Sequence, residues 1–581
     1  MRIPLRQYWT LLADYIRPQQ RRVLMLAMLL LGSIALQAVN PQIMRYFIDA
    51  ARSGATDDAL LRSALLFIML AVAQQGAAVG AAYLGENVGW TSTNALRSDL
   101  ARHCLHLDMS FHNRHTPGEM IERVDGDVTS LSNFFSQFTI QLLGNALLLL
   151  VILGLLFQED WRVGLVLTGF VVLAMAVLNR LRGIAVPQWH AAREASAELF
   201  GFLEERLAGT EDIRSAGAKA YVMRRFYELM RRILREHLRA GLMTNVMINT
   251  STMIFVVGNA LALAVGAYVY QAGLVTIGTV YLIFNYTNLI NRPIQRISQQ
   301  LEDLQRASAG ITRIRELFAT EATIVEHGTS LLPPGPLSVE FDRVSFSYDA
   351  DEPVLGDLSF RLEPGRVMGL LGRTGSGKTT ISRLLFRLYE PQEGTVRLGG
   401  VDIRDLPLAE LRRGVGMVTQ NVQLFHASLR DNLTFFDRGI SDESILRVIG
   451  ELGLQEWFES LPEGLDTEIE SGGSGLSSGE AQLLAFTRIF LKDPGLIVLD
   501  EASSRLDPAT EQLIERAVER LLKDRTGVII AHRLGTVLRA DEIMIIEEGR
   551  ILEHGDREVL AADPGSRFSG LLKTGLEEVL A

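Results

Sequence analysis

The chain has 581 residues, more than one domain usually holds, so at least two domains are expected. Its formal net charge of −11 is unfavourable for binding phosphates, and nucleic acid is therefore excluded as a partner. The single cysteine, Cys104, excludes an internal disulfide and fits reduced, cytoplasmic soluble parts.

The first half of the chain contains six apolar stretches that are long enough, or nearly so, to cross a bilayer. A membrane-spanning helix needs about 20 such residues, and the helix is the only open-chain structure that satisfies its backbone in lipid. We therefore predict an all-α domain of six transmembrane helices over residues 23–318, after an amphipathic elbow helix over residues 1–22. The six spans run approximately over residues 23–48, 64–84, 138–157, 163–178, 246–270 and 277–290.

The charges of the loops predict the orientation of these spans. Five arginines precede the first span, which places the N-terminus in the cytoplasm, and the acidic loop with Asp57 and Asp58 lies outside. The long loops at residues 85–137 and 179–245 are rich in arginine and lie inside. Their apolar residues recur at helical spacing, so we expect helices that continue into the cytoplasm. An even number of spans leaves the C-terminal half inside, which predicts a multi-pass protein of the cytoplasmic membrane.

A proline-rich break at residues 333–336 belongs to a predicted linker over residues 319–337, which precedes a soluble domain over residues 338–581. There, the apolar run 367–371 predicts a buried strand, followed by the letters GRTGSGKT and a helical pattern. Strand, glycine loop and helix in this order are the required context of the phosphate-binding loop G-x-x-x-x-G-K-[ST].

The glycines of this loop allow backbone N–H groups to turn toward phosphate, and the N-terminus of the following helix adds partial positive charge. Lys378 can reach the terminal phosphates, and the hydroxyl group of Thr379 can ligate Mg²⁺. The predicted nucleotide-binding residues of the loop are Gly372, Arg373, Thr374, Gly375, Ser376, Gly377, Lys378, Thr379 and Thr380.

Two further strand patterns end in polar residues. GLIVLDE ends in Asp500, which can hold Mg²⁺ through water, and Glu501, which is placed to polarise an attacking water. TGVIIAH presents His532, a candidate for contacting the γ-phosphate. A lone histidine is more often structural, but its position after a third strand of the same pattern favours the functional interpretation.

Together with LSSGE at residues 476–480, these motifs resemble the ATP-binding cassette of ABC transporters, and the whole chain resembles a half-size ABC exporter of the multidrug and lipid type. The resemblance implies an α/β P-loop NTPase domain after the six helices, with ATP and Mg²⁺ as cofactors. It also implies a dimer in which two cassettes sandwich two ATP molecules. Such a dimer would export a drug, lipid or peptide by hydrolysing ATP. An importer built on the exporter fold, or an ATP-gated regulator, would share this architecture.

Residue roles follow from the same resemblance. Tyr348 in VSFSYD would stack on adenine, Gln420 in VTQNVQLF would ligate Mg²⁺ and sense the membrane domain, and Asp507 in SSRLD would be the D-loop aspartate. The segments FHNRHTPGEM and FLEERLAGTEDI resemble the coupling helices that press on nucleotide domains. The resemblance assigns catalysis to Glu501, Gln420 and the switch histidine His532, and metal binding to Thr379, Gln420 and Asp500.

The signature LSSGE departs from the Leu-Ser-Gly-Gly-Gln of the family. Ser478 adds a side chain where glycine allows the closest backbone approach, and Glu480 can bring a carboxylate near ATP. Ala481 and Leu483 stand where the family usually has arginines. We hypothesise a heterodimer in which this chain supplies the intact catalytic glutamate, and the partner has a standard signature; a homodimer that tolerates LSSGE is the alternative. The altered signature, which faces the ATP held by the partner, consists of Leu476, Ser477, Ser478, Gly479 and Glu480.

Overall fold

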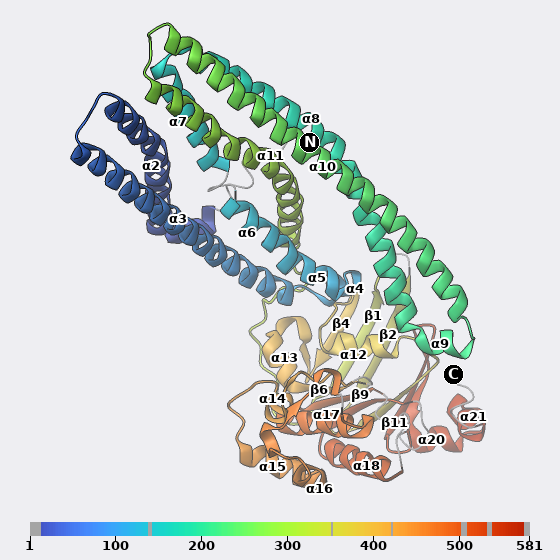
Figure 1. Ribbon diagram of the computed structural model, residues 1–581. Helices are drawn as coiled ribbons and strands as arrows, with labels where there is room; N and C mark the ends of the chain where they lie inside the picture. The colour runs from blue at the N-terminus through green and yellow to red at the C-terminus, as the bar shows by residue number, and fades with distance from the viewer. Residues whose placement is uncertain are drawn as a thin grey trace. The chain divides into compact units, whose positions relative to one another are not determined.

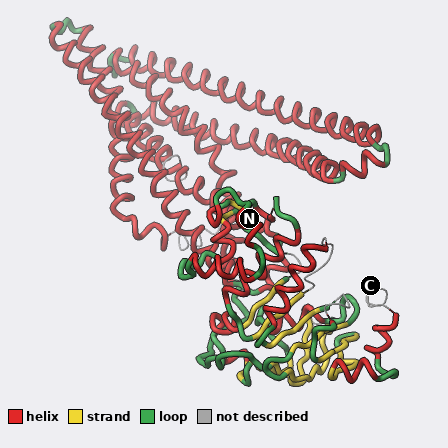
Figure 2. The backbone as a smooth tube through the Cα atoms, turned by 90° about the horizontal axis from the view of Figure 1, so that it is seen from below, coloured by secondary structure: helices red, strands yellow, loops and turns green. Residues whose placement is uncertain are grey.

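The computed structural model describes residues 13–137, 142–349, 352–419, 422–473, 475–500, 508–531 and 537–574. The described residues form two compact units. The first, which is helical, contains the chain up to Leu105 and Pro117–Thr320. The second contains His106–Thr116 and the chain from Glu321 onward, and all strands of the described residues lie in it (Figures 1 and 2). The domain boundaries drawn from the sequence stay predictions.

The helices of the first unit match the six predicted spans and their extensions. Among the described residues, four helices are long and apolar enough to cross a membrane: Ala13–Arg52, Asp57–His106, Trp161–Ala208 and Lys219–Gln271. The shorter apolar helix α7 and helix α11 overlap the third and sixth predicted spans, and residues 138–141 of the third span lie outside the described residues. The bounds are α2 Gln20–Arg52, α3 Asp57–His106, α5 Pro117–Ile121, α6 Asp127–Gln137, α7 Gly144–Glu159, α8 Trp161–Ala208, α9 Thr210–Ser215, α10 Lys219–Gln271 and α11 Ile277–Ala319.

Helices α8 and α10 run side by side and are much longer than a membrane is thick (Figure 1). They contain 48 and 53 residues, which gives lengths of about 72 and 80 Å at about 1.5 Å per residue. The hydrocarbon layer of a bilayer is only about 30 Å thick. More than half of each helix therefore stands outside the membrane, which confirms the predicted helical extensions.

Close packing inside the first unit depends on small residues. A Cβ atom on Gly258 of α10 would lie 2.4 Å from the ring of Phe170 on α8, so the two helices approach closely at this glycine. Polar groups join α2 to α11: Tyr286 donates a hydrogen bond to the carbonyl oxygen of Ala38 at 2.8 Å and accepts one from Gln42 at 3.1 Å. The buried Tyr286 hydroxyl is thereby satisfied, as a polar group at membrane depth must be.

The second unit contains two main sheets. The antiparallel sheet has the order β2-β1-β4-β5, and the larger sheet has the order β12-β11-β3-β10-β9-β6, in which only β12 is antiparallel to its neighbour. The short strands β7 and β8 pair separately. The strands are β1 Val339–Ser347, β2 Pro353–Leu362, β3 Val367–Leu371, β4 Glu393–Leu398, β5 Val401–Asp402, β6 Val415–Val418, β7 Ala427–Ser428, β8 Glu468–Ile469, β9 Leu496–Asp500, β10 Thr526–Ile530, β11 Glu542–Glu547 and β12 Arg550–Asp556.

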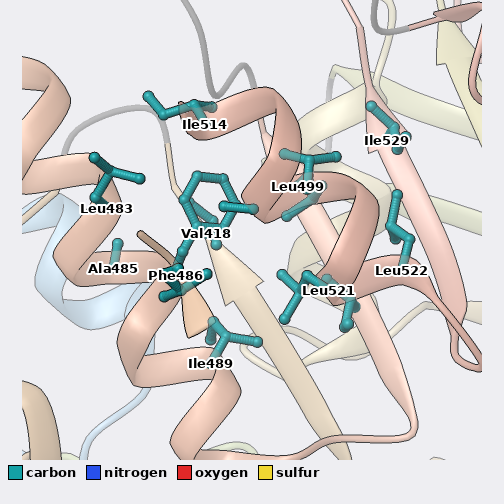
Figure 3. Close-up of a cluster of buried hydrophobic side chains, with 14 of the residues drawn as sticks. Val418, Leu483, Ala485, Phe486, Ile489, Leu499, Ile514, Leu521, Leu522 and Ile529 are labelled. Atoms are coloured by element: carbon teal, nitrogen blue, oxygen red, sulfur yellow. The ribbon is translucent and has the colours of Figure 1, made fainter. Parts of the chain in front are cut away.

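Helices cover these sheets and close their cores. In Figure 3, Phe486 and Ile489 of α17 lie in one cluster with Leu499 of β9 and Leu521 of α18. Leu483, at a position where the family usually has arginine, is 2% exposed and belongs to the same core.

The helices of the second unit are α4 Met109–Arg114, α12 Lys378–Leu385, α13 Leu408–Gly414, α14 Leu429–Thr434, α15 Asp442–Glu451, α16 Gln455–Glu459, α17 Ser478–Lys492, α18 Pro508–Leu522, α20 Arg557–Ala562 and α21 Arg567–Thr574. Shorter helical turns occur at Arg17–Gln19, Glu122–Gly126, Ile403–Asp405, Gly464–Asp466 and Ser471–Gly473.

The short segment with α4 belongs to the second unit although it follows the long helix α3 in the sequence. Asp108 holds it in place, because its carboxylate accepts hydrogen bonds from the backbone N–H of Thr323, from the Thr323 hydroxyl at 2.6 Å and from the Ile324 N–H at 3.4 Å. These bonds join residues that are more than 200 positions apart. The resemblance of FHNRHTPGEM to a coupling helix implies contact of this segment with a nucleotide domain, but not the bonds of Asp108 that hold it there.

Candidate active site

The phosphate-binding loop lies where the sequence predicts it, between the fully buried strand β3 and helix α12. A Cβ atom on Gly372 would lie 2.3 Å from the carbonyl oxygen of Ile546 on β11. Gly377 has a φ of +105°, and a Cβ atom there would lie 2.6 Å from the side chain of Leu355. Neither position can hold a larger residue without displacing its neighbours, which explains the two glycines at the ends of the motif.

Lys378 and Ser376 bring polar atoms into the turn. The Lys378 side chain is 6% exposed, and its Nζ donates hydrogen bonds to the carbonyl oxygens of Gly372 at 2.6 Å and Arg373 at 2.9 Å. The hydroxyl oxygen of Ser376 is buried and has no hydrogen-bond partner within the described part of the chain. A phosphate bound in this turn would give the Ser376 hydroxyl group a hydrogen-bond partner and would pair with the Lys378 ammonium group.

A cavity of about 620 Å³ opens over this loop. Because β3, β10 and β9 pair in parallel, their carboxyl ends meet at one edge of the sheet, and Asp500 at the end of β9 reaches the cavity. Tyr348, which directly follows β1, forms part of the wall. The predicted strands and the predicted loop are therefore brought together at one site. The lining residues are Tyr348, Val354, Thr374, Gly375, Gly377, Lys378, Thr379, Thr380, Arg383 and Asp500.

Tyr348 is held by residues of α12. Its hydroxyl accepts a hydrogen bond from Arg383 at 2.9 Å and lies 3.1 Å from the hydroxyl oxygen of Thr380. The Arg383 guanidinium also lies 5.7 Å from the centre of the Tyr348 ring, within cation–π range. Arg383 was not predicted as a site residue. Its position three residues after Thr380, on the same face of the helix, is the signal that could have found it.

The signature begins helix α17, and its altered glutamate turns back onto the helix itself. The Ser477 hydroxyl accepts a hydrogen bond from the N–H of Glu480 at 3.2 Å, and the Glu480 carboxylate accepts one from the N–H of Ser477 at 2.6 Å. This is a capping box, in which both residues satisfy backbone donors at the helix N-terminus. The Glu480 carboxylate is therefore bound within its own helix.

Arg488 on the same helix is a buried cation that the sequence analysis missed. It is 9% exposed and donates hydrogen bonds to the carbonyl oxygens of Asn432 at 2.7 Å and Gln423 at 3.0 Å. Its guanidinium lies 4.5 Å from the centre of the Phe435 ring. Burial lowers the pKa of Arg488 to about 10, which leaves it protonated at neutral pH. It joins α17 to α14 and to the chain that leads from β6.

Four predicted site residues lie outside the described residues: Gln420, Glu501, Asp507 and His532. The flanking strands are described, and β9 ends at Asp500 while β10 ends at Ile530. The two strands are paired in parallel, with Ile530 opposite Asp500. The roles of the four residues stay predictions.

Comparison with known proteins identifies the family. Residues 23–294 match the family model described as the ABC transporter transmembrane region, and residues 355–504 match the model described as ABC transporter. The chain is an ABC transporter. It is 30% identical over 573 residues to an uncharacterized ABC transporter ATP-binding protein, YknV, of Bacillus subtilis, and the alignment covers 98% of this chain and 94% of that protein. It is also 30% identical over 591 aligned positions to an ATP-dependent lipid A-core flippase of Pseudomonas fluorescens, covering 99% of this chain and 97% of the relative.

The solved structure of a bacterial Atm1-family ABC exporter with ATP bound matches this ABC transporter with a TM-score of 0.79 and 25% identity, over 96% of this chain and 98% of that one. A transmembrane region and a cassette in one chain make it a half-size exporter of the type IV fold, which confirms the predicted family and fold class. It is an ATP-hydrolysing transporter that binds ATP and must dimerise to form a complete machine. It is a multi-pass membrane protein with a cytoplasmic ATPase domain.

Proposed function

We propose that this half-transporter exports a small or amphipathic substrate, such as a drug, a lipid or a peptide, across the cytoplasmic membrane. In the proposed complex it pairs with a different half-transporter. This chain supplies an intact catalytic carboxylate, and the partner supplies a standard signature. The flippase relatives, which are named for lipid A-core, support lipid as one candidate cargo.

The capping box at the signature is the observation that carries the asymmetric part of this proposal. In a dimer of cassettes, the N-terminus of α17 would face the ATP on the phosphate loop of the partner. The N–H of Ser477, which could bind an anion there, already donates to the Glu480 carboxylate. A negative charge thus occupies the place where a helix N-terminus would attract phosphate. The ATP opposite this signature is positioned less well for hydrolysis and stays bound unhydrolysed, whereas the ATP on this chain's own loop meets the partner's signature.

The cavity supports ATP binding on this chain's own phosphate loop. Lys378 would neutralise the terminal phosphates, and the orphaned Ser376 hydroxyl would gain a partner. Tyr348, held by Arg383, would offer its ring to the adenine base. Thr379 and Asp500 both line the cavity and carry the oxygen ligands that Mg²⁺ prefers; when bound, Mg²⁺ supplies neutralisation of phosphate charge. Among the residues outside the described ones, Glu501 would polarise the attacking water, with Gln420, Asp507 and His532 completing the site around the γ-phosphate.

Substitution of Glu501 by Gln tests the catalytic part of the proposal. The amide keeps the size of the side chain but cannot take up a proton, so we expect ATP turnover to fall at least about a hundredfold, as loss of a general base does. ATP binding, measured without Mg²⁺, should stay unchanged. Turnover that survives this change would show that another residue acts as the base.

Native mass spectrometry of the complex, isolated by a tag on this chain from its own cells, tests the partner. The expected result is a mass that corresponds to this chain plus a second, different one. The sequence of that chain should contain a standard signature and a weakened catalytic carboxylate. Two identical chains would establish the homodimer and would contradict the asymmetric proposal.

A further inference from the structure

Asn113, at the end of α4, is hydrogen-bonded to a residue of the cassette. Its side-chain Nδ2 donates to the hydroxyl oxygen of Tyr389 at 2.6 Å, although the two residues are 276 positions apart. Tyr389 follows α12 and is only 8% exposed, while Asn113 is exposed. Burial raises the pKa of Tyr389, so its hydroxyl remains protonated throughout the physiological range. The bond therefore joins two neutral groups and does not vary with pH near neutrality.

The same Tyr389 packs against the proposed base-binding residue. Its ring lies 5.1 Å from the ring of Tyr348 at an angle of 87°, an edge-to-face contact. The ring of Phe346 contacts both tyrosines in the same manner, at 4.9 Å from Tyr348 and 5.7 Å from Tyr389. Three aromatic rings thus form one packed group. Because packed aromatic rings adjust together, a change in the orientation of Tyr348 requires a change at Tyr389.

The covalent chain carries such a change further. Helix α4 begins at Met109, and only two residues separate it from the end of α3 at His106. Helix α3 contains 50 residues and is one of the helices that can cross the membrane. A displacement of α4 therefore acts directly on the end of a transmembrane helix.

We propose that Tyr389 and Asn113 are positioning residues, through which α4 responds to a base stacked on Tyr348. This rests on the proposed function, in which Tyr348 binds adenine. Phosphates held by the loop around Lys378 would reach Tyr348 only indirectly, through the hydroxyl group of Thr380, whereas a stacked base would contact the Tyr348 ring itself. The inference therefore distinguishes a nucleotide with a base from a bare polyphosphate at the same loop.

A second contact between α4 and the cassette serves as the internal control. Arg114 lies 3.5 Å from the carboxylate of Asp349, the residue after Tyr348, but the two side chains are 69% and 75% exposed. An exposed ion pair of this kind contributes little, because water and salt screen it. Arg114→Ala thus removes a neighbouring contact of the same helix without touching the hydrogen bond between Asn113 and Tyr389.

Hydrogen exchange of the full dimeric transporter, followed by mass spectrometry, tests the inference. Mg²⁺ is chelated, so that ATP binds without turnover, and inorganic tripolyphosphate is the probe without a base. We expect ATP to slow exchange both at the phosphate loop and over residues 106–116, and tripolyphosphate to slow it at the phosphate loop only. Tyr389→Phe, which keeps the ring, and Asn113→Ala should each reduce the response of residues 106–116 by about fivefold, the factor that corresponds to one average hydrogen bond. Their double variant should lose no more than either single variant, since both break the same bond.

Each contrary outcome has a distinct meaning. Equal protection of residues 106–116 by tripolyphosphate and ATP, or a Tyr389→Phe variant that responds as the wild type does, overturns the inference while ATP binding at the loop still stands. A response lost in Arg114→Ala instead would place the route through the ion pair and would also overturn it. Absence of ATP protection at the phosphate loop itself would contradict the proposed function, and the inference with it.

Discussion

At the scale of single residues, Glu480 shows why a substitution in a motif has to be interpreted together with its local geometry. The sequence places a carboxylate where the family has an amide, close to a nucleotide site. At about 5 Å and an effective dielectric constant of about 20, its repulsion of a unit of phosphate charge would be about 3 kcal/mol. The capping box gives that carboxylate a second role, because a negative charge at a helix N-terminus stabilises the helix by roughly 0.3–1 kcal/mol.

Replacing Glu480 by Gln should separate these two roles. The neutral amide can still accept the hydrogen bond from Ser477, so the free energy of unfolding should fall by less than about 1 kcal/mol. The affinity for ATP at the facing site should rise, by at most about a hundredfold, since the repulsion is at most about 3 kcal/mol. Equilibrium binding of labelled ATP to the dimer measures this. Glu470 is an exposed residue before the signature, and Glu470→Gln makes the same change in charge. This control should leave the affinity for ATP unaltered. An equal rise in affinity in both variants would show that only the net charge of the chain matters, and not the position of Glu480.

Arg488 is a residue whose contribution to stability can be predicted from its contacts. Arg488→Met keeps much of the side-chain volume but leaves the carbonyl oxygens of Asn432 and Gln423 without their donor. We expect the cassette to lose about 2–4 kcal/mol of stability, the range for breaking a buried charged hydrogen-bond group. Thermal unfolding of the purified transporter measures the loss. Arg447→Met, on the exposed face of α15, should leave the unfolding temperature within about 1 °C, as surface changes usually do.

At the scale of elements, the phosphate-binding loop was predictable because its three signals are adjacent in the sequence. The apolar run of β3, the glycines at 372 and 377 and the pattern of α12 each point to the same local structure. The long helices were predictable for the same reason, since their apolar periodicity is continuous. Contact of the α4 segment with the cassette was expected from the resemblance of FHNRHTPGEM to a coupling helix. The single bonds that make this contact, such as the one between Asn113 and Tyr389, were not predictable, because they join residues far apart in the sequence.

The loop geometry predicts the outcome of a single methyl group at Gly377. Gly377→Ala would place a Cβ atom 2.6 Å from Leu355 at a φ of +105°, so the loop must shift, and we expect ATP affinity to fall at least about tenfold. Gly400→Ala is the matched control. Gly400 also has a positive φ, +81°, but a Cβ atom there meets nothing within 4 Å. The control should cost only the strain of the left-handed backbone, about 1–2 kcal/mol of stability, and should bind ATP as before. Loss of binding in both variants would show that destabilisation alone is responsible.

At the scale of the whole molecule, an asymmetric dimer makes the two nucleotide sites behave differently. In the proposed heterodimer, the site that uses this chain's phosphate loop and the partner's signature would turn over, while the site that faces LSSGE would retain its nucleotide. This asymmetry follows from the heterodimer that we propose and is absent from a homodimer, whose sites are equal by symmetry.

Nucleotide retention measures this asymmetry directly. After turnover of Mg-ATP and removal of free nucleotide, we expect the dimer to retain nucleotide at one site per pair of chains, because the facing site does not hydrolyse its ATP whereas the other site hydrolyses its ATP and releases the products. Extraction and chromatographic quantification give the stoichiometry. Equal occupancy of both sites, whether full or empty, would contradict the proposed division of roles.

The interleaving of the two units in the sequence limits what an excised fragment can report. The contacts of Asp108 with Thr323 and of Asn113 with Tyr389 belong to the cassette unit, yet Asp108 and Asn113 are encoded more than 200 residues before the rest of it. A soluble fragment that begins near Glu321 leaves the Thr323 N–H and the Tyr389 hydroxyl to water. Its ATPase rate would describe a cassette that lacks one of its own helices. Biochemical dissection of this transporter therefore needs the full-length chain, or a fragment to which residues 106–116 are added back as a peptide.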